Sequence, residues 1–167
     1  MLKKKSDVTL GNELYMILLD VIQMSEEKKK YIEHDEFCVS LNFGGGDLDP
    51  DEITRLLGVS PTTAWRIGEA VQRKNHTFTA ESGSWSISTV RSTRDIEEQL
   101  TELFAKLSGD SAVWSSLTNR YDASLFCGVF LSWFGHGFSM SPTLHRLLAD
   151  RNLEITFDIY DEYDHDA

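Results

Sequence analysis

One stretch of this chain occurs twice. Residues 43–57 (FGGGDLDPDEITRLL) return at a constant offset of 91 as residues 134–148 (FGHGFSMSPTLHRLL). The two copies share the leading Phe, two glycines and the closing Arg-Leu-Leu, and Ile53 is matched by Leu144. Each copy follows an apolar run typical of a strand and leads towards another. The repeat therefore predicts two β-α-β halves joined by a linker helix.

Apolar patterning predicts strands at 36–43, 84–90, 123–134 and 153–160. The third run is apolar at successive positions, which is typical of a central strand covered on both faces. The fourth strand alternates. Its predicted inward residues are Leu153, Ile155, Phe157 and Ile159, and its predicted outward residues are Glu154, Thr156, Asp158 and Tyr160.

Capping signals predict a short helix after Asp49, with Pro50 in its first turn and Gly58 at its end. A linker helix is expected to begin at 92–95 and to end at Gly109, followed by helices at 111–121 and 141–150. Residues 60–69 suggest a turn and an irregular or extended piece. The polar stretch 70–82 predicts a flexible loop.

These elements predict an α+β domain over residues 35–160. We expect one four-stranded mixed or antiparallel sheet with the first and third strands central and the helices mainly on one face, in a ferredoxin-like arrangement. A doubly wound parallel sheet is the alternative. Residues 1–34 form a predicted amphipathic helical extension that packs on the domain or forms a homodimer, and residues 161–167 form an acidic tail.

A hydrophobic fraction of 41% is enough to build a full core. No stretch is long and apolar enough to span a bilayer, and Glu13 and Asp20 interrupt the first apolar run, so we expect neither a signal peptide nor a membrane protein. Cys38 and Cys127 lie in apolar strands, which predicts buried, unlinked thiols and a cytoplasmic location. A disulfide between them is the alternative.

The chain carries a net charge of −11, and residues 150–167 hold seven acids against Arg151. Such a surface repels phosphate backbones, so nucleic-acid binding is not expected. It suits a basic protein partner, and simple solubility is the alternative.

The sequence lacks the residues that several kinds of functional site require. The glycine-rich turns have no Lys or Ser/Thr in a phosphate-binding position, so their glycines are interpreted as strand exits with unusual φ/ψ. DLDPDE lacks the glycine and the late Glu of a calcium loop, and it is explained by helix capping. His136 and His145 have no companion ligands at a suitable spacing, and no nucleophile motif occurs. We predict no catalytic residue, metal site or cofactor.

Trp65 and Arg66 follow a turn and belong to no clear core period. Trp and Arg are typical anchors of protein interfaces, so the pair is a candidate for contact with a partner or for lining a groove. A Trp that closes a small core is the structural alternative.

The residues from Leu48 to Gly68 carry a resemblance. They follow the pattern L-D-P-x-x-[IV]-[ST]-x-x-L-G-[LIV]-x-P-[ST]-x-x-W-x-x-G through Leu48, Asp49, Pro50, Ile53, Thr54, Leu57, Gly58, Val59, Pro61, Thr62, Trp65 and Gly68. This pattern resembles the bacterial and phage domain of unknown function family 4279 over about residues 35–160. The resemblance implies a small bacterial accessory protein, of a kind whose genes often lie near toxin or phage loci. The N-terminal extension, the triple glycine and the acidic tail depart from it.

Acidity, small size and this resemblance predict a non-enzymatic binding protein, specifically an immunity-type inhibitor that neutralises a basic toxin. The candidate contact residues are Glu154, Asp158, Asp161, Glu162, Trp65 and Arg66. One alternative is an enzyme or small-molecule binder with a groove near Trp65 and Arg66. Another is a structural or oligomerising accessory protein that uses the N-terminal helix.

Overall fold

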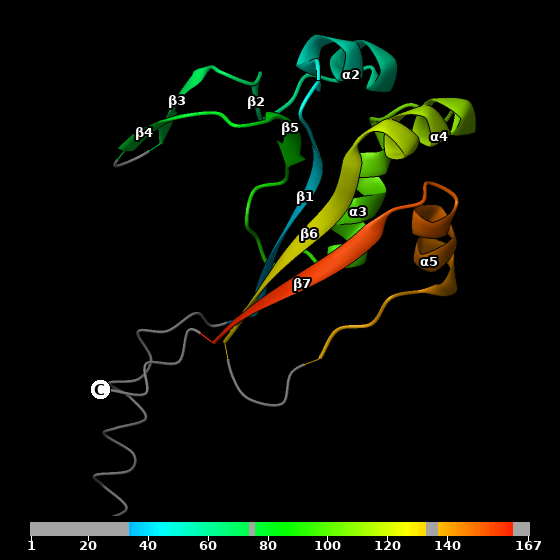
Figure 1. Ribbon diagram of the computed structural model, residues 1–167. Helices are drawn as coiled ribbons and strands as arrows, with labels where there is room; N and C mark the ends of the chain where they lie inside the picture. The colour runs from blue at the N-terminus through cyan, green and yellow to red at the C-terminus, as the bar shows by residue number, and fades with distance from the viewer. Residues whose placement is uncertain (1–33, 74–75, 133–136, 162–167) are drawn as a thin grey trace, which may run out of the picture.

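The computed structural model describes residues 34–73, 76–132 and 137–161. The predicted N-terminal helix and the acidic tail after Asp161 lie outside these residues. Figure 1 shows a twisted sheet with helices beside it. In chain order the elements are β1 (Glu36–Gly45), α2 (Pro50–Leu57), β2 (Thr63–Trp65), β3 (Ala70–Arg73), β4 (His76–Thr79), β5 (Gly83–Ser88), α3 (Ile96–Ala105), α4 (Ser111–Arg120), β6 (Asp122–Leu131), α5 (Pro142–Ala149) and β7 (Glu154–Asp161).

The main sheet has five strands in the order β2-β5-β1-β6-β7. β1 pairs antiparallel with β5 and β6, β2 pairs antiparallel with β5, and β7 runs parallel to β6. The predicted mixed α+β sheet with β1 and β6 inside is confirmed. The prediction of four strands is wrong because the short piece 63–65 pairs with β5 and adds a strand. The parallel β6–β7 pair beside the antiparallel β1–β5 pair also gives the two halves different topologies.

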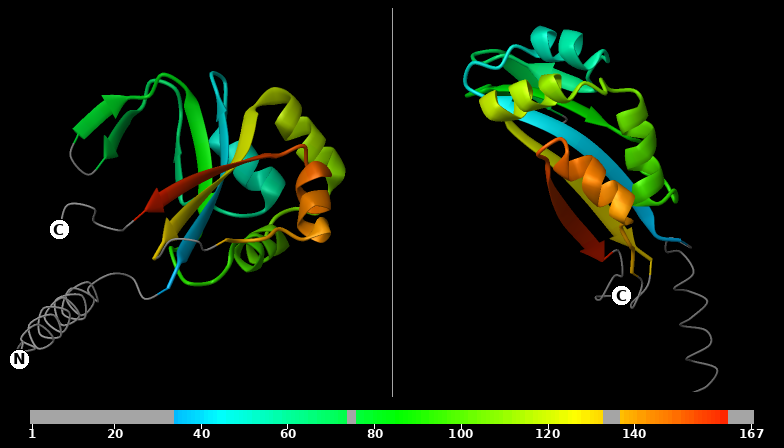
Figure 2. Two further views of the ribbon diagram at one scale, coloured as in Figure 1. Left: turned by 90° about the horizontal axis from the view of Figure 1, so that it is seen from below. Right: turned by 90° about the vertical axis from the view of Figure 1, so that its right-hand side faces the viewer.

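The described helices lie on one face of the sheet (Figure 2). Strand alternation explains this arrangement. In β1, Val39, Leu41 and Phe43 are buried on the helix side, while Ser40 and Asn42 point the other way and are only half-buried. α3 packs against β1, α4 packs against β6, and α2 packs against β5 and α4. The core therefore sits between one sheet face and a single helical layer.

β6 differs from the prediction that it would be covered on both faces. Its buried residues Leu125, Cys127 and Val129 face the helices, whereas Phe126 and Phe130 lie on the opposite face and are partly exposed. The continuous apolar run of β6 therefore faces the helices on one side and a partly exposed surface on the other. In β7, Ile159 was predicted to be inward but is 57% exposed because this edge of the sheet extends past the helices.

Residues 70–82 are not simply a loop, as had been predicted. β3 and β4 form an antiparallel hairpin in which Val71 lies opposite Phe78. The hairpin is fixed to the sheet by Trp65, whose ring meets Phe78 edge-on at 6.2 Å, and by the hydrogen bond from Gly68 N to Ala80 O at 2.8 Å. It projects on the side of the sheet away from the helices (Figures 1 and 2).

The predicted caps of α2 are confirmed. Asp49 accepts a hydrogen bond from Asp51 N at 3.1 Å, and Gly58 ends the helix with φ 79°. The unusual φ/ψ predicted for the glycines at 44–46 is not a positive φ, since among the described residues the glycines with positive φ are Gly58 and Gly68. Gly45 lies close to a buried aromatic ring. A Cβ there would lie 3.0 Å from the ring of Tyr121.

Both thiols are free, but only Cys127 is fully buried. Burial raises its pKa to about 12. Cys38 is half-buried, which corrects the prediction for that residue. Cys38 is paired across the sheet with Gly128, the neighbour of Cys127, so the two sulfur atoms lie on opposite faces.

Candidate functional site

The face of the main sheet opposite the described helices is the first candidate site, and we call it the uncovered face. Register assigns its residues, since partners on neighbouring strands share a face. They are Thr63 and Trp65 on β2; Ser84, Ser86 and Ser88 on β5; Glu36, Cys38, Ser40, Asn42 and Gly44 on β1; Asp122, Ser124, Phe126, Gly128 and Phe130 on β6; and Glu154, Thr156, Asp158 and Tyr160 on β7.

The middle of the uncovered face is lined by small polar side chains that hydrogen-bond to one another. Ser40 Oγ donates to Ser88 Oγ at 2.8 Å, and Ser86 Oγ donates to Asn42 Oδ1 at 2.6 Å. In these bonds the Ser40 hydroxyl contacts another hydroxyl and the Ser86 hydroxyl contacts a side-chain amide, and neither bond involves a histidine or a carboxylate. The arrangement leaves a low polar surface that a partner can approach closely, and it does not activate a nucleophile.

Aromatic side chains flank this polar centre. On one side, the rings of Phe130 and Tyr160 stack with centroids 4.8 Å apart, and the guanidinium of Arg91 lies 3.6 Å from the centroid of Phe130. Arg91 also donates to Glu36 at 2.5 Å. Gly128 makes room for this layer, because a Cβ there would lie 2.9 Å from Cys38 Sγ and 3.1 Å from the Phe130 ring. Trp65 lies at the opposite edge, on β2.

The structure places three of the six predicted contact residues on two edges of this one face. Glu154 and Asp158 project from β7, as predicted, and Trp65 belongs to β2 at the far side of the sheet. Tyr160 donates a hydrogen bond to Asp158, and this bond raises the pKa of Tyr160. Asp161 is the last residue of β7, and Glu162 lies outside the described residues.

Arg66 is engaged by carboxylates at the start of α2. Its Nη2 donates to Asp49 at 2.7 Å and to Asp51 at 2.5 Å, which raises its pKa. Glu69 lies 4.0 Å away. Arg66 thus ties the end of β2 to the N-terminus of α2. Together with the edge contact between Trp65 and Phe78, this gives the Trp65–Arg66 pair a structural role that its sequence did not show.

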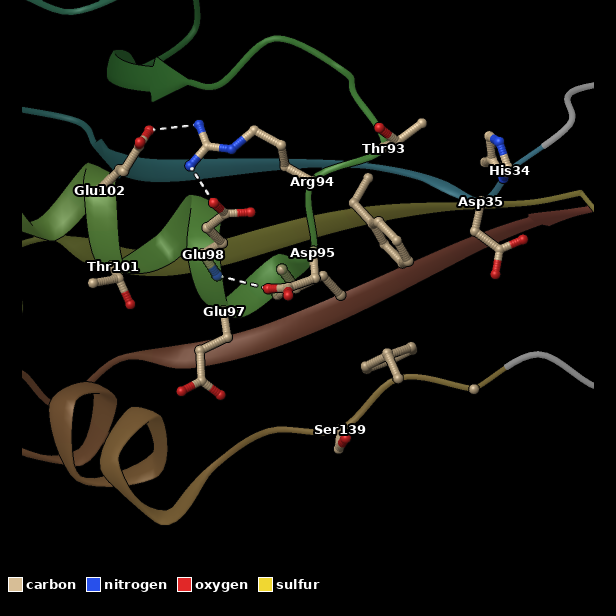
Figure 3. A pocket seen from close by; sticks show the side chains of 14 residues that line it. His34, Asp35, Thr93, Arg94, Asp95, Glu97, Glu98, Thr101, Glu102 and Ser139 are labelled. Atoms are coloured by element: carbon tan, nitrogen blue, oxygen red, sulfur yellow. Dashed lines mark hydrogen bonds and ion pairs between the residues drawn. The ribbon is translucent and has the colours of Figure 1, made fainter.

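A second candidate is a cleft of about 1050 Å³ on the helix side of the sheet (Figure 3). Three chain segments line it: 34–37 at the start of β1, 93–102 at the start of α3, and 137–139. We call it the α3 cleft. Figure 3 shows acidic side chains on both sides of it. The carboxylates are those of Asp35, Asp95, Glu97, Glu98 and Glu102.

Each carboxylate of the α3 cleft already has a local role. Arg94 donates to Glu102 at 2.7 Å and lies 3.3 Å from Glu98, and these two acids raise its pKa. Asp95 caps α3 by accepting from Glu98 N at 2.7 Å. Glu97 accepts from Ser141 N and Oγ at 2.9 and 2.6 Å, and Asp35 accepts from Ser132 N and Oγ at 2.8 Å.

Sequence reasoning missed the α3 cleft because its residues come from three distant segments. The signal present in the sequence was the acid-rich start of α3, and that pattern is explained equally well by helix capping. Within the described ranges, no three His, Cys, Asp or Glu side chains gather in a way that could hold a metal ion. The helices of those ranges also include none that is long and apolar enough to cross a bilayer.

Comparisons with known proteins give one match. Neither curated proteins nor solved structures match the chain. Residues 35–162 match the family described as Domain of unknown function (DUF4279), and this stretch includes every described strand and helix. The motif residues that carry the resemblance run from the residues just before α2, through α2 and β2, to Gly68. The chain belongs to the DUF4279 family.

Proposed function

We propose that this protein is a non-enzymatic binding protein that holds a basic protein against the uncovered face of its sheet, as an immunity-type inhibitor of a basic bacterial toxin would. One observation carries the proposal. The acids Glu154 and Asp158 share a single open face with aromatic side chains at both of its edges, Trp65 and the Phe130–Tyr160 stack.

The composition of the uncovered face suits a protein interface. Interfaces combine aromatic anchors with polar groups whose hydrogen bonds are already satisfied. Here Trp65 and Tyr160 supply rigid rings, and the bonded pairs Ser40–Ser88 and Asn42–Ser86 supply a polar centre with little desolvation cost. The uncovered face spans five strands, so it is wide enough for a helix or a hairpin of a partner to lie across it.

Charge supports a basic occupant. Asp122, Glu154 and Asp158 add three carboxylates to the uncovered face, and the sequence continues from β7 into further acids. Arg91 on the same side is already paired with Glu36. Complementary charge raises the association rate of a basic partner and suppresses binding of acidic ones.

The test reverses the charge of the β7 acids. Glu154→Lys with Asp158→Lys is compared with Asp47→Lys with Asp150→Lys, which changes the net charge equally at exposed positions after β1 and α5. Each protein is immobilised and exposed to extract of the native host, and the captured protein is then measured by association kinetics at two salt concentrations. We expect the β7 pair to slow association about tenfold or more, the control pair to slow it far less, and added salt to slow the wild type.

Two results would contradict the proposal. One is the absence of any captured protein. The other is a captured protein whose association rate is insensitive to salt and changes no more in the β7 pair than in the control pair. Either result would leave the small-molecule alternative near Trp65 as the better hypothesis.

A further inference from the structure

We propose that the outer edge of β7 binds an extended segment of the basic partner as an additional strand of the main sheet. The bound segment alternates in character. Two basic side chains, four residues apart, lie on the uncovered face, and apolar side chains lie on the helix side. The inference rests on the proposed function for the basic character of the partner. It adds the mode of binding and the sequence pattern that the partner must carry.

The two edges of the main sheet differ in how open they are. β2 forms one edge, has three residues, and its Trp65 lies against Phe78 of the β3–β4 hairpin. β7 forms the other edge and has eight residues. Among the described strands, only β6 pairs with β7, which borders the sheet in Figure 2. A strand of this length spans about 26 Å, at about 3.3 Å per residue, so a whole strand of a partner can pair with it.

The backbone of β7 is regular enough to accept another strand. Its register with β6 is continuous, from Ser124 opposite Glu154 to Leu131 opposite Asp161, so no bulge twists this edge away. Its sequence, EITFDIYD, contains neither Pro nor Lys, the residues that commonly protect an edge, and it is rich in β-branched and aromatic residues. Pairing with β6 uses the backbone groups on one side of β7, and a row of N–H and C=O groups faces outward.

Exposed apolar side chains gather at this edge. Within the described part of the chain, the exposed large hydrophobic residues are Ile67, Val90, Phe138, Ile159 and Tyr160. The last two lie on β7, and the ring of Phe138 lies 4.9 Å from that of Phe157 on the same strand. Ile159 and Phe157 share the helix side of β7 by alternation. An added strand with apolar side chains on that side would bury surface that is now exposed.

The charges on the other side of β7 select a basic strand. Glu154 and Asp158 both lie on the uncovered face, and β7 has no basic residue. The hydroxyl of Tyr160 donates to Asp158, but this neutral donor leaves the carboxylate charged. Opposed side chains on paired strands have Cβ atoms about 5 Å apart, so a Lys or Arg of the added strand would meet each carboxylate.

The same two carboxylates disfavour a second copy of the chain as the occupant. An antiparallel pair of β7 strands centred on Thr156 would place Glu154 of each copy opposite Asp158 of the other. Like charges directly opposite one another destabilise a strand pair. The edge therefore discriminates in favour of a basic segment from a different protein.

The first experiment follows amide hydrogen exchange along β7, residue by residue, in the full-length wild-type protein. In the free protein, we expect alternate amides to exchange about tenfold or more faster than their neighbours, whose N–H groups bond to β6. The probe is the acetylated peptide Lys-Val-Thr-Val-Lys-Val-Thr at millimolar concentration and low salt. We expect it to slow the fast set about fivefold or more. If the free protein showed no fast set, another part of the chain would occupy the edge and the proposal would be wrong.

Two sets of control peptides separate strand pairing from charge attraction. Lys-Val-Thr-Lys-Val-Val-Thr has the same composition, but its lysines are three residues apart and fall on opposite faces of a strand, so we expect it to protect β7 several-fold less. The second set carries N-methyl groups on the backbone, either at the lysines and threonines or at the valines. A strand docked by one edge uses only one of these sets of N–H groups, so one methylated peptide should lose protection and the other should keep it.

A pair of protein variants tests the carboxylates. Glu154→Gln with Asp158→Asn should weaken binding of the first peptide about threefold or more, and the matched control Asp47→Asn with Asp150→Asn should leave it near the wild-type value. No slowing of exchange by the peptide, or an equal effect of the two methylated peptides, would overturn edge pairing. Either result would leave the proposed function standing, because that function fails only if the capture experiment fails.

Discussion

The two strand–turn–helix units, β1–α2 and β6–α5, begin alike and end differently. In each unit Pro occupies the first turn of a helix of eight residues, and the same two buried positions face the core: Ile53 and Leu57 in α2, Leu144 and Leu148 in α5. In the first half of the chain, β5 pairs with β1 and is antiparallel to it. In the second half, β7 follows α5 and is parallel to β6.

The connections explain the difference. Residues 150–153 link α5 directly to β7, so the helix carries the chain back along the sheet and the next strand must run parallel. Residues 58–82 follow α2 and hold β2 and the β3–β4 hairpin, which reverse the direction again before β5. Both short links, 58–62 and 150–153, lead to a strand parallel to the first strand of the unit, since β5 is antiparallel to both β1 and β2. The repeated residues therefore determine a strand exit and a buried helix face, while β5, which pairs between β1 and β2, makes the two halves differ.

The largest expected effect tests whether both units contribute equally to the core. Ile53 and Leu144 are 0% and 2% exposed. Ile53→Ala and Leu144→Ala should each lower the free energy of unfolding by about 2–5 kcal/mol, since each leaves a cavity among packed side chains. Chemical denaturation of both variants measures this. A loss below about 1 kcal/mol for one of them alone would show that its helix is peripheral and would end the parallel between the units.

A smaller effect concerns the caps, Asp49 and Ser141. Each side chain accepts from a backbone N–H of its helix, so Asp49→Ala and Ser141→Ala should each cost about 1 kcal/mol. Ser141 also donates to Glu97, which links α5 to α3. Combined with Glu97→Gln, Ser141→Ala should cost less than the sum of the two single changes in a thermal denaturation cycle. If the two single changes add exactly in the double variant, the hydrogen bond between Ser141 and Glu97 contributes nothing to stability.

The smallest expected effect is a pH dependence of stability that arises from α2 and has no counterpart in α5. The hydrogen bond from Arg120 lowers the pKa of Glu52 on α2, and α5 has no acidic residue. A Glu whose pKa is lowered in the folded state stabilises the protein at pH values above the ordinary pKa of a Glu. This stabilisation is lost as the pH falls through the pKa of the folded state. Glu52→Gln should therefore lower the melting temperature at neutral pH and match the wild type in strong acid. If the difference in melting temperature between the two proteins stayed constant from neutral pH to strong acid, the effect would come from packing and not from the charge of Glu52.

Local patterns predicted most of the elements. Capping residues marked α2, and alternation marked β1 and β7, because each signal depends on neighbours in sequence. The β3–β4 hairpin was missed because the apolar residues within its described pairs are few, namely Ala70, Val71 and Phe78, and such a sequence shows little periodicity.

The sites were harder to predict than the elements. Glu154 and Asp158 were correctly expected to point outward, because alternation along one strand gives that result. Their shared face with Trp65 depends on the order of five strands, and the α3 cleft depends on three segments meeting in space. Neither is encoded within one window of sequence. The continuous apolar run of β6 likewise did not reveal that one of its faces stays open.

β7 forms a long edge of the main sheet, and this has a consequence for how copies of the chain behave together. An edge strand presents unpaired N–H and C=O groups that can template pairing with another molecule. Ile159 on this strand is 57% exposed and would favour such stacking. Glu154 and Asp158 oppose it, since two β7 edges brought together would place carboxylates against carboxylates. We therefore expect these two acids to disfavour edge-to-edge pairing between copies of the chain.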